Sequence, residues 1–202
     1  MHLNEKLDVA EALEAMGVDV IEAGFPAASE GELKAVREIA AVLKRSTVAA
    51  LCRCRKEDID KGYEAVKDAA HPRLHIFLAT SPIHLEYKLR INEDTAIDMI
   101  RTHTEYARTL VDDVEFSFED ATRTPHEFLA RAARTAASSI VPSPPKASSL
   151  WQSAGTASSA EISFSAKSPR AESAASTAFL TGWQTSVDFV KTAIFIIRIP
   201  SA

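Results

Sequence analysis

The chain has 202 residues and a formal net charge of -5. This charge gives no general electrostatic reason to bind nucleic acid or an anionic membrane surface. The first residues mix acids and bases without the apolar core of a signal peptide, and no apolar run is long enough to cross a bilayer. We therefore expect a cytoplasmic protein that binds neither nucleic acid nor a membrane.

Cys52 and Cys54 are the only cysteines, and they lie two positions apart. A disulfide between such close positions on a strand is strained, so we expect free thiols in a reducing compartment. One cysteine pair without a second pair is a weak signal for zinc.

The first 132 residues alternate between helical and strand patterns. We expect helices over residues 4–16, 29–43, 56–69 and 92–110, strands over 18–23, 47–52, 74–80 and 113–119, a loop over 81–90, and a further helix that begins at 125. Gly17 marks the end of the first helix, and Ser29 with Glu32 forms a capping box for the second. Pro72 ends the third helix.

Near-continuous apolar strands that alternate with helices predict an α/β protein with parallel strands and right-handed crossovers. Either a (β/α) barrel or an open doubly wound sheet is compatible with this pattern. No P-loop and no Gly-x-Gly-x-x-Gly follows a strand, which argues against nucleotide binding. In both folds the site lies at the carboxyl ends of the strands, and here those ends carry polar residues: Glu22, Arg53 or Arg55, His75 with Thr80 and Ser81, and Ser117 with Glu119.

The character of the sequence changes after residue 132. Residues 133–186 contain 14 serines and 12 alanines, whereas residues 1–132 contain 4 serines. Such a composition buries too little apolar surface to offset chain entropy. We expect two parts, an ordered domain over 1–132 and a largely disordered, low-complexity tail over 133–202, in which residues 187–199 are a candidate strand.

Three segments of the first part resemble one enzyme family. They are Gly17-Val-Asp-Val-Ile-Glu-Ala-Gly-Phe-Pro26, Leu74-His-Ile-Phe-Leu-Ala-Thr-Ser-Pro-Ile-His-Leu-Glu-Tyr-Lys88 and Asp113-Val-Glu-Phe-Ser-Phe-Glu-Asp120. Their order and spacing resemble 2-isopropylmalate synthase, a metal-dependent TIM-barrel acyltransferase related to homocitrate and citramalate synthases. The resemblance ends near Ala132. It implies a partial (β/α)8 TIM barrel, about strands 2–5 of the family with their helices.

The resemblance also implies an activity, which is the condensation of acetyl-CoA with 3-methyl-2-oxobutanoate in leucine biosynthesis. It implies a divalent metal (Mn, Mg or Zn), a homodimer, and a keto-acid pocket that includes Glu22, His75, Ser117 and Glu119 of this chain. From the residues alone, a histidine such as His75 on an apolar strand is more often a hydrogen-bonded core residue, and Glu22 is equally compatible with an ion pair to Arg53 or Arg55.

The sequence also departs from the family. The Arg-Asp-Gly and His-x-His motifs that hold the family's metal do not occur in it. His84 and Glu86 form at most a weak metal pair. We therefore expect no metal site and no catalytic residue in this chain, and a fragment that is inactive alone. A shift of reading frame near residues 125–145 would explain the change in composition. The alternatives are a non-catalytic remnant or interaction module that docks on an intact barrel, and a relative of homocitrate or citramalate synthase.

Overall fold

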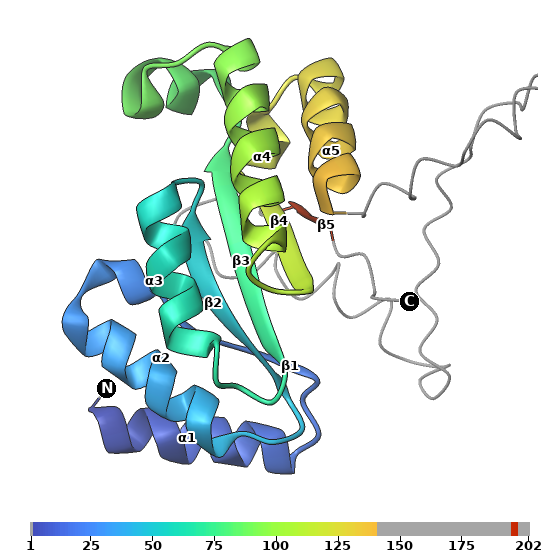
Figure 1. Ribbon diagram of the computed structural model, residues 1–202. Helices are drawn as coiled ribbons and strands as arrows, with labels where there is room; N and C mark the ends of the chain where they lie inside the picture. Colours follow the sequence, from blue (N-terminus) through green and yellow to red (C-terminus); the bar gives the residue numbers. More distant parts are fainter. Residues whose placement is uncertain (1, 141–194, 198–202) are drawn as a thin grey trace, which may run out of the picture. The chain divides into compact units, whose positions relative to one another are not determined.

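Figure 1 shows the computed structural model of the chain, which describes residues 2–140 and 195–197. The helices are α1 (Leu3–Ala15), α2 (Glu30–Val42), α3 (Lys56–Val66), α4 (Glu93–Arg108) and α5 (His126–Ile140), with shorter helical segments η1 (Pro26–Ala28), η2 (His84–Leu89) and η3 (Ala121–Arg123). The strands are β1 (Val20–Gly24), β2 (Thr47–Arg53), β3 (Pro72–Ala79), β4 (Asp113–Glu119) and β5 (Phe195–Ile197). In these residues no helix combines the length and apolar character of a membrane span.

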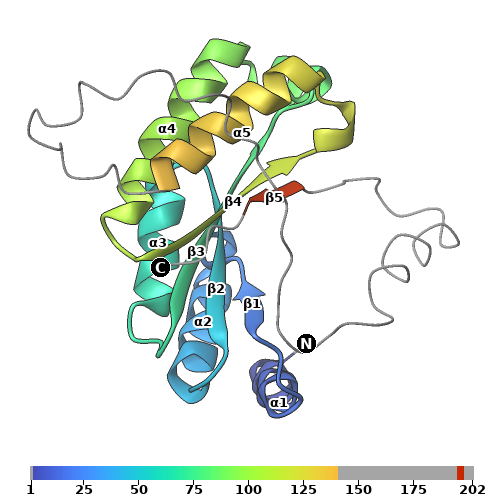
Figure 2. The same ribbon diagram turned by 90° about the vertical axis from the view of Figure 1, so that its right-hand side faces the viewer.

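The strands β1 to β4 form a parallel sheet in chain order, each paired with the next. Helices α2 to α5 all cover the same face of this sheet, as Figure 2 shows in a view along its edge. An open doubly wound sheet places helices on both faces, whereas consecutive strands with helices on one face are a segment of a (β/α)8 barrel. The prediction of a partial TIM barrel is confirmed.

The helix caps follow the sequence signals. The Ser29 hydroxyl accepts the Glu32 N–H at 3.2 Å, and the Asn92 side chain accepts the Thr95 N–H at 2.8 Å. The prediction of an α2 cap at Ser29 is therefore confirmed. The reciprocal half of the predicted box is absent, because the Glu32 carboxylate instead contacts Lys6 of α1.

Most boundaries lie within two residues of expectation, and three segments differ by more. The segment 81–90, expected to be a loop, contains the π-helix η2, whose end is marked by Arg90 in the left-handed region at φ 56°. Helix α3 ends at Val66, three residues short of the expected end at 69. Helix α5 continues past residue 132 to Ile140. The disordered tail expected over 133–202 is therefore wrong for residues 133–140, and its remainder lies outside the described residues, apart from β5, which pairs antiparallel with β4 and confirms a strand within 187–199.

The core lies between the sheet and its helices. Alternate residues of each strand point toward the helices and are almost inaccessible, among them Val48 and Cys52 of β2, Ile76 of β3 and Phe116 of β4. Cys54, just beyond β2, is buried beside them. Both cysteines are free, as predicted. Burial raises the pKa of the Cys54 thiol to about 12 and also raises the pKa of Cys52, so both remain protonated at neutral pH.

Helix α3 packs against β2 at a glycine. A Cβ atom built on Gly62 would lie 2.3 Å from Cys52 Sγ and 3.1 Å from a Leu74 methyl group. This contact lets the helix approach the sheet more closely than any larger residue allows.

Replacing this glycine therefore tests the packing. We expect Gly62→Ala to destabilise the fold by about 2 kcal/mol, since the clash outweighs the better helix propensity of alanine. Urea unfolding measures this difference. The control is Gly31→Ala in α2, where the nearest atom to the added Cβ is 3.7 Å away, and there we expect no loss of stability. Equal effects of the two substitutions would contradict the close approach.

Candidate functional site

The face of the sheet away from the helices carries the polar residues of the strands. The register places Leu51 beside His75 and His75 beside Glu115, and in the next inward-facing row it places Phe77 beside Ser117. Because alternate strand residues share a face, these five side chains lie on the side that becomes the interior of a barrel. His75, Glu115 and Ser117 are all less than 9% exposed, so each polar atom there needs a partner.

Three of the predicted site residues, Glu22, His75 and Ser117, contact one another, and these contacts supply hydrogen-bond partners for the buried His75 and Ser117. The Glu22 carboxylate contacts Nδ1 of His75, and the Ser117 hydroxyl lies 2.7 Å from Nε2 of the same ring. A carboxylate only accepts hydrogen bonds, so Nδ1 carries a proton. In the neutral ring Nε2 then accepts the Ser117 hydroxyl proton. The chain Glu22–His75–Ser117 thus joins β1, β3 and β4 and fixes the tautomer of the imidazole.

An arginine with two acidic partners, which the sequence did not indicate, lies beneath the Glu22–His75–Ser117 chain. Arg73 is 2% exposed and donates to Asp113 at 2.6 Å and to Glu115 at 3.0 Å. The other oxygen of Glu115 is 3.8 Å from His75 Nε2. Arg73 therefore offsets the charge of a carboxylate that faces the imidazole. The alternation of Glu115 with Ser117 placed Glu115 on this face, but only the strand register shows that Arg73 reaches it.

Glu119, the fourth predicted residue, is not part of the chain. Both of its carboxylate oxygens lie 2.7 Å from the ammonium of Lys88 on η2, at the carboxyl edge of the sheet. The alternative interpretation, in which Glu22 forms an ion pair with Arg53, is wrong. The Arg53 guanidinium instead binds Asp58 at 2.6 and 3.0 Å and lies over the Phe25 ring.

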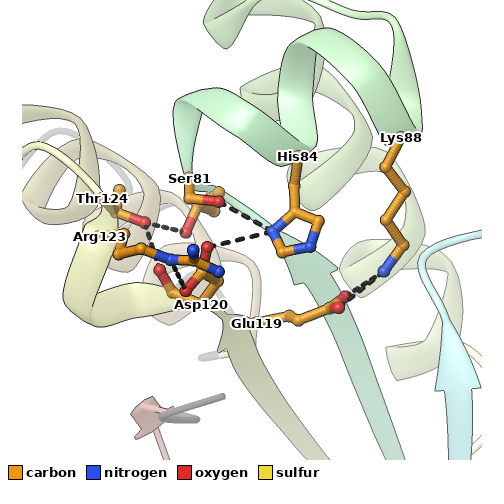
Figure 3. A network of polar contacts seen from close by, with 8 residues as sticks. Ser81, His84, Lys88, Glu119, Asp120, Arg123 and Thr124 are labelled. Atoms are coloured by element: carbon orange, nitrogen blue, oxygen red, sulfur yellow. Dashed lines mark hydrogen bonds and ion pairs between the residues drawn. The ribbon is translucent and has the colours of Figure 1, made fainter. Parts of the chain in front are cut away.

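A further polar cluster at the same edge joins η2 to the end of β4 (Figure 3). His84 Nδ1 lies 3.1 Å from Asp120 Oδ2 and 2.9 Å from the Ser81 hydroxyl, while Arg123 donates to Asp120 at 2.6 Å. Thr124 hydrogen bonds to Thr80 at 2.7 Å. The Asp120 side chain is completely buried, and its backbone has φ 63°, a left-handed conformation that Asp tolerates better than most residues.

The charge of Asp120 is stabilised by these partners. Burial alone would raise the pKa of its carboxyl group, but the hydrogen bonds from Arg123 and Ser81 and the charge of Arg123 together lower the pKa below its ordinary value of 3.8. Asp120 is therefore an ionised, inaccessible acceptor that holds η2 against β4.

Comparison with known proteins identifies the family of this chain. The profile of the HMGL-like family matches residues 1–143. The chain belongs to the HMGL-like family. The match extends past residue 132, where the resemblance read from the sequence ends.

Two curated relatives are similar to this chain. The 2-isopropylmalate synthase of Caulobacter sp. (strain K31) is 52% identical over 136 residues, which are 67% of this chain and 26% of that protein. The 2-isopropylmalate synthase of Staphylococcus aureus (strain JH9) is 53% identical over 133 residues, 66% of this chain and 26% of that protein. The chain thus spans about a quarter of the length of these relatives.

The HMGL-like family is generally metal-dependent, and a metal ion needs several ligand side chains close together. Among residues 2–140, no group of three or more His, Cys, Asp or Glu side chains could hold one. His84, considered with Glu86 as a weak metal pair, has its Nδ1 against Asp120. These residues do not fit a metal centre, and no step below passes through a metal.

The buried carboxylate of Asp120 allows a stability test. We expect Asp120→Asn to lower the free energy of unfolding by about 2 kcal/mol at pH 7, since it loses charge-assisted hydrogen bonds while asparagine keeps the left-handed backbone. The folded pKa lies below the ordinary value of 3.8, so this contribution is fully present above about pH 4 and is lost as the pH falls through the folded pKa. Urea unfolding at several pH values measures it.

The matched control is Asp112→Asn, at an exposed position just before β4. We expect this change to leave the stability unaltered at every pH. A deficit for Asp120→Asn that stays constant down to pH 2 would contradict the role of the ionised carboxylate.

Proposed function

We propose that this chain forms the keto-acid-binding part of a 2-isopropylmalate synthase, the enzyme that condenses acetyl-CoA with 3-methyl-2-oxobutanoate and water. The observation that carries the proposal is the hydrogen-bonded chain Glu22–His75–Ser117 on the inner face of the sheet. The names of the relatives that match two thirds of this chain support the same activity.

The inner face offers both kinds of contact that a branched keto acid needs. The substrate's oxygens only accept hydrogen bonds, so we propose that the Ser117 hydroxyl exchanges its bond to His75 Nε2 for one to a substrate oxygen, beside the imidazole. Leu51 and Phe77 flank them in the strand register, are half-buried, and lie outside the core cluster that packs against the helices. We infer that these two apolar side chains contact the isopropyl group, where each buried methylene contributes about 0.8 kcal/mol.

Binding of the keto acid tests the polar half of this pocket. We expect 3-methyl-2-oxobutanoate to bind the full chain, and Ser117→Ala and His75→Asn each to weaken binding about 10-fold, the loss of one hydrogen bond of roughly 1.4 kcal/mol. Isothermal titration calorimetry measures the affinities. Ser138→Ala, on an exposed turn of α5, is the matched control and is expected to bind normally. Equal affinities for all four proteins would refute the pocket.

We infer that the apolar side chains Leu51 and Phe77 determine which keto acid the site prefers. We expect the wild-type chain to prefer 3-methyl-2-oxobutanoate over pyruvate by about 10-fold, and Phe77→Ala to reduce this ratio, because pyruvate lacks the branch that the ring contacts. Competition calorimetry with pyruvate and 2-oxoglutarate gives the ratio. A preference for either competitor would instead favour a relative of citramalate or homocitrate synthase.

We also propose that the chain by itself does not complete the reaction, because its sequence contains neither Arg-Asp-Gly nor His-x-His. Release of CoA thiol from acetyl-CoA, 3-methyl-2-oxobutanoate and Mn²⁺ is expected to stay at the uncatalysed rate. Robust turnover would show that other residues of this chain supply the missing groups. Binding without turnover distinguishes a substrate-binding fragment from a remnant that only docks on an intact barrel.

A further inference from the structure

The proposed condensation requires a base, because a proton must leave the methyl carbon of the acetyl group before a carbon–carbon bond can form. A base needs an uncommitted lone pair, and a pKa near the working pH makes it efficient. Imidazole meets the second condition better than a carboxylate does. The inference below rests on the proposed function.

The other titratable groups at this face are already engaged, including Glu115, which pairs with Arg73 at 3.0 Å. Both ring nitrogens of His75 have partners, Nδ1 in Glu22 and Nε2 in Ser117. Both carboxylate oxygens of Glu119 lie 2.7 Å from the Lys88 ammonium and are therefore already paired. Glu22 is engaged by His75 through one oxygen, and its remaining oxygen belongs to a carboxylate, ordinarily a weaker base than imidazole.

His84 differs from these groups. Its Nδ1 faces Asp120 Oδ2 at 3.1 Å, and because Asp120 is ionised and can only accept, Nδ1 carries the proton. In the neutral ring Nε2 therefore holds a free lone pair, and it has no hydrogen-bond partner among the residues that the structure describes. The side chain is 25% exposed, and Figure 3 shows this second nitrogen turned away from Asp120.

The position of His84 is also held from both sides. His84 and Lys88 lie four residues apart on η2 and contact the adjacent residues Asp120 and Glu119 at the end of β4. The imidazole is thus fixed at the carboxyl edge of the sheet, the edge at which (β/α) barrels bind substrates. A buried carboxylate behind an imidazole both orients the ring and stabilises the imidazolium that forms when it takes a proton.

We propose that His84 is the base that removes a proton from the acetyl carbon of an acyl thioester, and that Asp120 is its positioning residue. The C–H bond breaks, its electron pair moves to give the thioester enolate, and the proton passes to Nε2. The imidazolium so formed is paired with the Asp120 carboxylate. The enolate carbon then attacks the keto carbon of the second substrate, whose C=O π bond opens and leaves the negative charge on the former keto oxygen.

An electrophilic substrate analogue tests this placement without requiring turnover. S-bromoacetyl-CoA carries a reactive carbon where the acetyl methyl group lies; attack by a neutral imidazole forms an N–C bond, breaks the C–Br bond and releases bromide. We expect the full chain to be alkylated at His84, at a rate that saturates with reagent and falls in the presence of acetyl-CoA. Peptide mapping by mass spectrometry identifies the site.

Substitutions distinguish the role of His84 as the base from the role of Asp120 in positioning it. His84→Gln is expected to abolish this labelling, and Asp120→Asn to slow it at least about 10-fold, because the ring loses its orientation and its fixed tautomer. His103→Gln, on α4 with its Nδ1 bonded to the Met99 carbonyl, is the matched control and should label at the wild-type rate. Circular dichroism confirms that each variant is folded under the assay conditions.

The outcomes also separate this inference from the proposed function. Binding of 3-methyl-2-oxobutanoate without labelling of His84, or labelling that acetyl-CoA does not slow, overturns the assignment of the base and leaves the keto-acid pocket standing. Absence of both labelling and keto-acid binding overturns the proposed function as well. Labelling of Asp120→Asn at the wild-type rate overturns the positioning role of Asp120.

Discussion

The inner face of this sheet depends on the pairing of polar side chains that are removed from water. An imidazole and a hydroxyl at His75 and Ser117 would each be costly to bury alone. The structure connects them in one chain that begins at the half-exposed carboxylate of Glu22. Since the three residues come from β1, β3 and β4, this chain of contacts depends on the observed strand register, and it couples the order of the strands to the geometry of the inner face.

The two ends of the sheet use charges in different ways. Beneath the Glu22–His75–Ser117 chain, Arg73 is inaccessible and bridges Asp113 and Glu115, so it offsets the charge of Glu115, which lies 3.8 Å from the imidazole. At the carboxyl edge, Lys88 and His84 of η2 engage Glu119 and Asp120 in succession. The first arrangement lies beneath the Glu22–His75–Ser117 chain, and the second holds the helical segment η2 at the carboxyl edge. The fold therefore holds an imidazole at each of these two places, and of the two only His84 has a ring nitrogen without a hydrogen-bond partner within the described part of the chain.

Sequence patterns predicted most of this fold because the strands β2, β3 and β4 are nearly continuous apolar runs and the helix caps at Ser29 and Asn92 are local signals. The π-helix η2 was missed for a physical reason: its i to i+5 bonds do not give the 3.6-residue period, and the apolar residues from Ile83 to Leu89 alternate instead. Glu22, His75 and Ser117 could be predicted because each lies on a strand of the sheet. The contacts of Arg73 with Asp113 and Glu115 could not be predicted, since they depend on the strand register. The His84–Asp120 contact could not be predicted either, since it depends on the left-handed backbone of Asp120 beyond β4.

The hydrogen-bonded state of His75 tests the central claim most directly. Long-range ¹H–¹⁵N NMR of the full chain, labelled at histidine, distinguishes the two neutral tautomers of each ring. The structure predicts that Nδ1 of His75 is protonated, that Glu22→Gln disturbs this signal, and that 3-methyl-2-oxobutanoate shifts Nε2. A His75 ring protonated at Nε2, with signals that neither the substitution nor the keto acid changes, would contradict the account.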